Sequence, residues 1–193
     1  MKEILQMLPN LHLHDVIKNT NEIKAVLDNT KGWGGNFYDR LYLAHRGPNS
    51  EILSELNEQP LFKNLVQKVL GYMATPTKDE FLPELVKVSF INKYTGNDYL
   101  VYHDDYDIDE NEGTVQVFVT VSIGATRILH FKNKKTGRID QSYELKDGDL
   151  FIFNPVVNET HEHGMDKEPG AGVRYSLLIP LEYRFRRHRV YWK

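Results

Sequence analysis

Apolar residues recur at the spacing of amphipathic helices in the first third of the chain. One such segment follows Pro60, and its apolar positions are Leu61, Leu65, Val66, Val69 and Met73. Proline is favoured as the first residue of a helix because its fixed backbone angle suits that place, so a helix from Pro60 to near Gly71 is expected. Asn49–Ser50 is expected to cap an earlier helix, with apolar positions at Ile52, Leu53 and Leu56.

The segment before these helices, residues 29–48, has a different character. It is rich in glycine and aromatic residues, and its apolar positions follow no regular period. Such a composition predicts a loop or an irregular hairpin.

From about residue 85 the period of the apolar positions changes to two, which is typical of strands. The clearest run is residues 114–123, where one face carries Val115, Val117, Val119, Val121 and Ile123. The other face is polar except at Phe118. Further strands are expected at residues 85–94, 127–131, 138–145, 150–153 and 173–181, with turns at 132–137 and 146–149. Many short strands joined by tight turns predict a sandwich or barrel of the jelly-roll type.

Helices followed by strands indicate the α+β class, with the N-terminal helices packed outside a double-stranded β-helix (jelly-roll) barrel. The 193 residues suffice for one domain with a hydrophobic core. We expect a single domain over residues 1–193, in which 1–84 form a helical and lid part and 85–187 form the jelly-roll core.

The composition limits the chemistry and the location of the protein. The sequence contains no cysteine, so His, Asp and Glu are its strong metal ligands. It shows neither a signal peptide nor an apolar run that could span a membrane, and a cytoplasmic location is expected. The net charge of −3 gives no overall attraction to nucleic acid, although residues 182–193 are basic and aromatic and residues 104–112 are acidic.

A pair of metal ligands is indicated by His103 and Asp105. Two residues apart on a strand, they point to the same face and can bind one ion at its end. A second histidine cluster, Thr160–Gly164, offers a third ligand in His161 or His163. Two histidines and one carboxylate leave coordination positions open for a chelating cosubstrate and O2. Arg174 follows on a later strand and can form a bidentate pair with a carboxylate.

The stretch from Asn92 to Arg174 resembles the 2-oxoglutarate/Fe(II) oxygenase superfamily, and within it most closely the AlkB family of nucleic-acid dealkylases. The matching motifs are Asn-Lys-Tyr (92–94), His103-x-Asp105, Thr-Val-Ser-Ile-Gly (120–124), Asp-Gly-Asp-Leu (147–150), His163-Gly-Met and Arg-Tyr-Ser-Leu (174–177).

The resemblance implies roles for particular residues. His103, Asp105 and His163 would hold the iron, and it favours His163 over His161 because Gly-Met follows it. Asn92, Tyr94 and Arg174 would bind 2-oxoglutarate. One position departs from the family pattern: a second arginine normally follows six residues after the first, and here that residue is Pro180. Arg184 and Arg186 are the candidates to replace it.

The resemblance also implies an aromatic flap that holds a flipped base. Trp33 is the best candidate for it, with Phe37, Tyr38 and Tyr42 nearby, and Tyr102 beside His103 is a further substrate candidate. The alternative is that these aromatic residues only anchor a loop to the barrel. Asp104 is expected to point away from the metal, and no role is assigned to His12, His14, His45 and His188.

The function implied is an Fe(II)/2-oxoglutarate-dependent dioxygenase that hydroxylates a C–H bond and releases succinate and CO2. The expected substrate is a nucleic-acid base, single-stranded or flipped, in DNA repair or modification by oxidative dealkylation or base-methyl hydroxylation. The alternative is an oxygenase that acts on a small molecule or a protein side chain. A third hypothesis is a non-catalytic jelly-roll binding protein with a structural metal.

Overall fold

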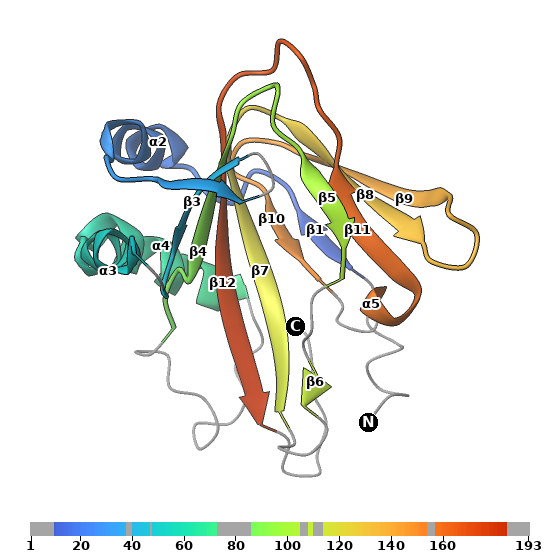
Figure 1. Ribbon diagram of the computed structural model, residues 1–193. Coiled ribbons are helices and arrows are strands. Elements are labelled where there is room, and N and C mark those ends of the chain that lie inside the picture. Colours follow the sequence, from blue (N-terminus) through green and yellow to red (C-terminus); the bar gives the residue numbers. More distant parts are fainter. Residues whose placement is uncertain are drawn as a thin grey trace.

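The computed structural model describes residues 10–37, 40–46, 48–72, 86–104, 108–109, 114–153 and 157–184. Within them, two antiparallel sheets form a jelly-roll-like sandwich (Figure 1). The major sheet has the strand order β1-β10-β7-β12-β4-β3-β2, with β6 paired to β7, and the minor sheet has the order β5-β11-β8-β9. The strands of the major sheet are β1 (Leu11–Leu13), β2 (Gly34–Phe37), β3 (Arg40–Ala44), β4 (Phe90–Tyr94), β6 (Ile108–Asp109), β7 (Thr114–Gly124), β10 (Leu150–Ile152) and β12 (Arg174–Arg184). Those of the minor sheet are β5 (Leu100–His103), β8 (Arg127–Asn133), β9 (Ile139–Leu145) and β11 (His161–Met165).

Three helices lie on the face of the major sheet that points away from the minor sheet (Figure 1). They are α2 (Thr20–Asn29), α3 (Ser50–Glu58) and α4 (Pro60–Tyr72), and a short α5 (Val157–Thr160) precedes β11. Their apolar faces share one hydrophobic cluster with the strands, which includes Ile23, Leu27, Leu53, Phe62, Val66, Val121, Leu177 and Ile179. Burial of these side chains is the main force that holds the helices to the sheet. None of the described helices is long and apolar enough to cross a membrane.

The starts of two helices agree with the sequence pattern, but the cap of one does not. Helix α4 begins at Pro60 and α3 at Ser50. The side chain of Asn49 makes no capping bond to α3. Instead its Nδ2 donates to the carbonyl of Tyr42 at 2.8 Å, and its Oδ1 accepts from the amide of Ala44 at 3.3 Å. Asn49 therefore fastens strand β3 to the start of α3.

The N-terminal part contains strands that the helical interpretation omitted. Strand β1 pairs with β10, and the β2–β3 hairpin extends the sheet through β4. The hairpin has a register shift, so residues 29–48 include the irregular hairpin that was one of two predicted options. The N-terminal part thus supplies both edges of the major sheet as well as its helical cover.

The two faces of strand β7 explain why Phe118 interrupts its alternation of apolar and polar residues. Val119, Val121 and Ile123 are fully buried on the helix side of the sheet. Phe118 and Thr120 face the other way and line a cavity between the sheets. The apolar residue on the polar face therefore belongs to a second, interior surface that is partly aromatic.

Candidate active site between the sheets

A cavity of about 500 Å³ lies between the two sheets. Its lining contains the polar side chains of Arg40, Asn92, His103, His163 and Arg174, together with apolar walls that include Phe90, Tyr94, Phe118, Leu129, Phe153 and Met165. This volume is in the usual range for small-molecule sites. The cavity therefore combines imidazole nitrogens of the kind that can bind a metal, cationic groups and a largely apolar wall.

His103 and His163 are direct partners across strands β5 and β11. Their ring centroids are 4.3 Å apart, which allows both imidazoles to approach one ion. A register shift accompanies the pair: the four residues of β5 from Leu100 to His103 pair with the three residues of β11 from His163 to Met165. The extra residue is a β-bulge, a device that re-aims side chains beside active sites. It turns both Leu100 and His103 toward the cavity.

A hydrogen bond determines which ring nitrogen of His103 carries the proton. Its Nδ1 lies 2.7 Å from the carbonyl oxygen of Val101, which can only accept, so Nδ1 carries the proton. The lone pair of the neutral ring is then on Nε2, as a metal ligand requires.

His161 and His163 occupy different environments. His163 is 4% exposed and lines the cavity. His161 uses both ring nitrogens elsewhere: Nε2 bonds Oδ1 of Asp140 at 2.8 Å, and Nδ1 bonds the hydroxyl of Thr160 at 2.8 Å. The structure thus brings His163, and not His161, together with His103. Asp105, the third ligand expected from the sequence, lies outside the described residues.

Asp104 lies at the edge of the same cavity and is held by a lysine. Its carboxylate accepts a hydrogen bond from Nζ of Lys134, and this bond is the main reason why the pKa of Asp104 is lowered. The carboxylate of Asp104 is therefore directed to Lys134.

Arg174 is fully buried in the cavity wall. Its Nε donates to the hydroxyl of Ser122 at 3.2 Å, and its Nη1 lies 3.8 Å from the sulfur of Met165. Its Nη2 is buried and has no hydrogen-bond partner among the described residues. Burial lowers the pKa of Arg174 to about 10, so the guanidinium remains charged at neutral pH. A buried cation with an unsatisfied donor fits a carboxylate ligand, because an unpaired polar group in the interior is costly.

Tyr94 and Asn92 of β4 also reach the cavity. Tyr94 is the cross-strand partner of Arg174 and is completely buried, which raises the pKa of its hydroxyl. Asn92 is buried beside it, and its Oδ1 accepts a hydrogen bond of 2.7 Å from Nε of Arg40. Both residues expected to contact the cosubstrate therefore lie with Arg174 on one face of the major sheet.

Arg40 is a site residue that the sequence interpretation missed. It is buried, lines the cavity and comes from β3, next to β4 in the sheet. Its guanidinium carbon lies 5.7 Å from the ring centroid of Tyr94, the same distance as that of Arg174. Arg40 precedes the run Leu-Tyr-Leu, which is a short strand pattern. This pattern was the available indication in the sequence that Arg40 belongs to a strand.

Arg184 and Arg186 were the candidates to replace the missing second arginine. Pro180 lies in β12 opposite Phe118, and Arg184 ends the same strand. At roughly 3.3 Å per residue, the backbone of Arg184 is about 33 Å along the strand from that of Arg174. Arg186 lies outside the described residues. The second guanidinium in the cavity is that of Arg40.

Two aromatic residues expected at the substrate lie elsewhere. Trp33 packs against Tyr175 with ring centroids 5.6 Å apart, on the helix side of the sheet, and its Nε1 donates to the carbonyl of Thr30. Trp33 therefore anchors its loop to the sheet, which was the alternative to a role in substrate binding. Tyr102 extends to Asp166 and Lys132 rather than into the cavity, because it precedes the inward-turned His103. Tyr38 is outside the described residues, and so is the side chain of Phe37.

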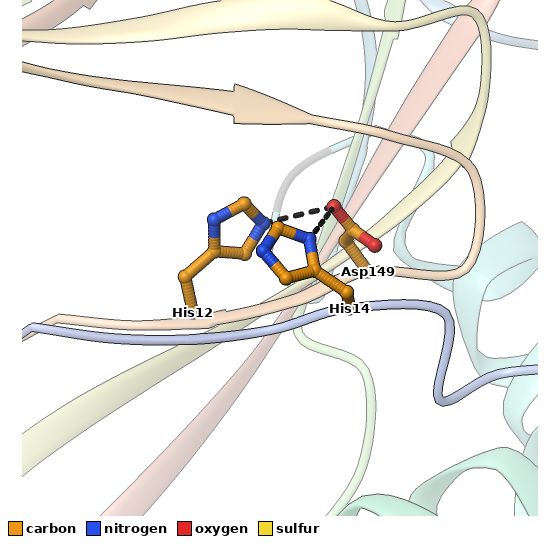
Figure 2. Close-up of side chains that lie close together, drawn as sticks. All are labelled: His12, His14 and Asp149. Atoms are coloured by element: carbon orange, nitrogen blue, oxygen red, sulfur yellow. Dashed lines mark hydrogen bonds and ion pairs between the residues drawn. The ribbon is translucent and has the colours of Figure 1, made fainter.

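A second group of potential metal ligands, also missed, does not line this cavity. Its three side chains are drawn in Figure 2. His12, His14 and Asp149 place ligand atoms within 4.8 Å of one another. Both histidines were assigned no partner from the sequence, whereas each bonds Asp149, more than 130 residues away along the chain. The His-x-His spacing on an alternating segment was the available signal.

Comparison with known proteins supports one class. The model of the 2OG-Fe(II) oxygenase superfamily matches residues 19–188, so the chain belongs to this superfamily. No curated protein sequence matches it. Among solved structures, OsALKBH1 is similar at 15% identity with a TM-score of 0.55, covering 89% of this chain and 97% of that one. HygX from Streptomyces hygroscopicus, solved with nickel, 2-oxoglutarate and hygromycin B, is similar at 11% identity with a TM-score of 0.60, covering 96% and 86%.

A third similar structure is the viral collagen prolyl hydroxylase vCPH from Paramecium Bursaria Chlorella virus-1, in complex with 2OG. It has 12% identity and a TM-score of 0.50, with 92% of this chain and 98% of that chain covered. At these identities the likeness shows the fold alone. The superfamily makes the chain an Fe(II)/2-oxoglutarate-dependent dioxygenase, with iron, 2-oxoglutarate and O2 as its cofactor and cosubstrates.

Proposed function

We propose that His103, Asp105 and His163 hold the iron, and that Arg174, Asn92 and Tyr94 hold 2-oxoglutarate. The observation that carries this proposal is the presence of the His103–His163 pair and the buried Arg174 on the walls of one cavity. Two imidazoles and a carboxylate form the facial set used by non-haem iron oxygenases. When bound, the iron would supply the chemistry by which O2 oxidises 2-oxoglutarate to succinate and CO2 and converts a substrate C–H bond into C–OH.

The protein's own groups position the reactants and exclude water. The bond from His103 to the carbonyl of Val101 places the proton on Nδ1, so that Nε2 carries the lone pair that a metal ligand uses. Arg174 offers Nη2 to the distal carboxylate of 2-oxoglutarate, while Ser122 holds its Nε. Phe118 and Phe153, neighbours on the major-sheet wall of the cavity, keep the site largely apolar, which strengthens these ionic contacts.

Arg40 takes the part of the second arginine in this proposal, in place of Arg184 or Arg186. Its Nε–H holds the oxygen of Asn92, so the amide NH2 of Asn92 is the end directed to a ligand. Its charge also adds to that of Arg174 in the same cavity. Arg40 is therefore a positioning residue for Asn92 and a further attraction for an anionic cosubstrate.

For the substrate, we propose a nucleic-acid base undergoing oxidative dealkylation or hydroxylation of a methyl group. The support is the AlkB-like set of motifs together with the aromatic cavity walls at Phe90, Phe118 and Phe153. Enzymes that act on a base hold it outside the helix, stacked between aromatic or apolar side chains. If the oxidised carbon is attached to a ring nitrogen, the hydroxylated product breaks down to an aldehyde and the restored base.

The second candidate is a small molecule or a protein side chain. The net charge of −3 gives no general attraction to phosphates. Structures of this fold also include HygX with hygromycin B bound and a collagen prolyl hydroxylase.

One binding experiment separates these substrates. Fluorescent single-stranded DNA, with and without N-methylated bases, is titrated with the iron-free protein, Mn²⁺ and 2-oxoglutarate at two salt concentrations. A nucleic-acid oxygenase binds the DNA, binds it more weakly at high salt, and prefers the methylated strand. Equal and negligible binding of both strands at low salt would favour the second candidate.

A further inference from the structure

The turn before β10 carries a buried carboxylate that two histidines share. Asp149 is 1% exposed, and its Oδ2 accepts from Nε2 of His12 at 2.8 Å and lies 3.3 Å from Nδ1 of His14. The imidazole rings are 4.0 Å apart at their centroids. Both histidines come from β1 and the residue after it, and they converge on one oxygen atom (Figure 2).

These separations are those of ligands around a single ion. With metal–ligand bonds of about 2.0–2.1 Å, adjacent ligand atoms lie roughly 2.9 Å apart in octahedral geometry and 3.4 Å in tetrahedral geometry. The two observed separations, 2.8 and 3.3 Å, match this range. We propose that His12, His14 and Asp149 form a second metal site, for a divalent ion of the Zn²⁺ type, distinct from the iron site.

The surroundings of Asp149 hold the carboxylate in place for this role. Its Oδ1 accepts from the amide of Asp15 at 2.8 Å, and its Oδ2 also accepts from the amide of Lys146 at 2.9 Å. Binding of the ion replaces the two imidazole N–H contacts: each neutral ring moves its proton to its other nitrogen and turns a lone pair to the metal. His12 is largely buried, whereas the side chain of His14 is 66% exposed, so water can complete the coordination shell.

The second site is separated from the cavity by aromatic rings. The ring of His12 contacts Phe151 at 5.9 Å, Phe151 contacts Phe153 at 5.1 Å, and Phe153 contacts His163 at 4.7 Å between centroids. None of His12, His14 and Asp149 lines the cavity. An ion there does not share ligands with the iron.

The position of this site gives the ion a structural effect. Strand β1 is the edge of the major sheet and is only three residues long, so few ladder hydrogen bonds hold it. An ion between β1 and the turn before β10 fastens the N-terminal segment to the sheet. An ion that binds only the folded chain raises its stability by mass action.

Zn²⁺ and Co²⁺ are the probes, and their stoichiometry is the readout. Wild-type protein is expected to bind two equivalents of Co²⁺, His14→Ala one, His163→Ala one, and the double variant none. The matched control is His130→Ala, because His130 is also a strand histidine with a hydrogen-bonded partner, Ser142, and it keeps both equivalents. Circular dichroism checks that each variant is folded.

Thermal unfolding in the His163→Ala background isolates the second site. Zn²⁺ is expected to raise the Tm of His163→Ala and to leave the Tm of the double variant unchanged. If the wild type binds one equivalent of Co²⁺ and His14→Ala still binds it, the proposal is overturned. The cluster of His12, His14 and Asp149 would then be a set of hydrogen bonds without a metal. If instead His163→Ala retains two equivalents and His14→Ala one, the second site stands and the assignment of His163 to the iron fails.

Discussion

Arg40 and Arg174 reach the ring of Tyr94 from the two strands that flank β4, each with its guanidinium carbon 5.7 Å from the ring centroid. Both cations are buried in the wall of one cavity. Burial of a charge is costly unless an opposite charge or several hydrogen bonds compensate it. A dicarboxylate such as 2-oxoglutarate supplies that compensation, so the contribution of each arginine is expected to appear in cosubstrate affinity.

Replacement of Arg174 by Gln is expected to weaken 2-oxoglutarate binding by roughly 10- to 100-fold, since hydrogen bonds to charged groups contribute about 1.5–3 kcal/mol. Arg174→Lys keeps the charge but loses the planar fork, and an intermediate loss is expected. Anaerobic calorimetry with Mn²⁺ measures both. The control ligand is 2-oxobutyrate, which lacks the distal carboxylate. Equal losses for both ligands would place Arg174 away from that carboxylate.

Arg40→Gln is expected to weaken 2-oxoglutarate binding by about tenfold, because the variant loses one charge-assisted hydrogen bond to Asn92. Arg184→Gln is the matched control, since Arg184 lies at the opposite end of β12 from Arg174. This variant should bind 2-oxoglutarate with the affinity of the wild type. The same titration measures both variants. A loss in Arg184→Gln and none in Arg40→Gln would reverse the two assignments.

His163→Ala is expected to abolish the visible charge-transfer absorption of an Fe(II)–2-oxoglutarate chelate, because the iron loses a ligand. His161→Ala should retain this absorption, since both nitrogens of His161 bond groups outside the cavity. The two variants differ by two positions on one strand and therefore control for each other. Retention of the band in His163→Ala alone would identify His161 as the ligand.

The stability of the fold is expected to decrease in alkaline solution through Tyr175. Burial, together with its hydrogen bond of 2.7 Å to Asp28, raises the pKa of Tyr175. In the unfolded chain this hydroxyl ionises near pH 10, so its stabilising contribution is present below about pH 10 and is lost as the pH rises toward the folded-state pKa.

Tyr175→Phe tests this effect by urea denaturation at pH 8 and above pH 10. At pH 8 the free energy of unfolding of the variant should be about 1 kcal/mol lower than that of the wild type, because the hydrogen bond is missing. The difference in the free energy of unfolding between the variant and the wild type should become smaller as the pH rises above 10. A constant difference across this range contradicts the assigned cause.

Local sequence patterns predicted a substantial part of the fold. The helix that begins at Pro60 and the long alternating strand β7 both follow from side-chain periodicity, which depends on neighbours in the chain. Phe118 broke the pattern of β7 because that strand has two apolar environments, the helix-covered core and the cavity. Alternation alone cannot distinguish a solvated face from a cavity wall.

Contacts between distant segments were the part that the sequence could not provide. Arg40 reaches the site because β3 joins the sheet next to β4, 52 positions away from Asn92 in the chain. His12 meets Asp149 across 137 positions. Trp33 was expected at the substrate, but the pairing of β3 with β4 leaves it packed on Tyr175 on the helix side. Each outcome depends on sheet order, which a single sequence does not reveal.

We propose that His163, with His103 and Asp105, holds the iron of an oxygenase that acts on nucleic acid. The most direct test is succinate release by anaerobically iron-loaded protein given 2-oxoglutarate and O2, with and without methylated single-stranded DNA. We predict that the DNA increases succinate release by wild type and by His161→Ala, and that His163→Ala releases none. Succinate release by His163→Ala at the wild-type rate would rule out His163 as an iron ligand. No release by iron-loaded wild type with the DNA present would rule out an oxygenase that acts on nucleic acid.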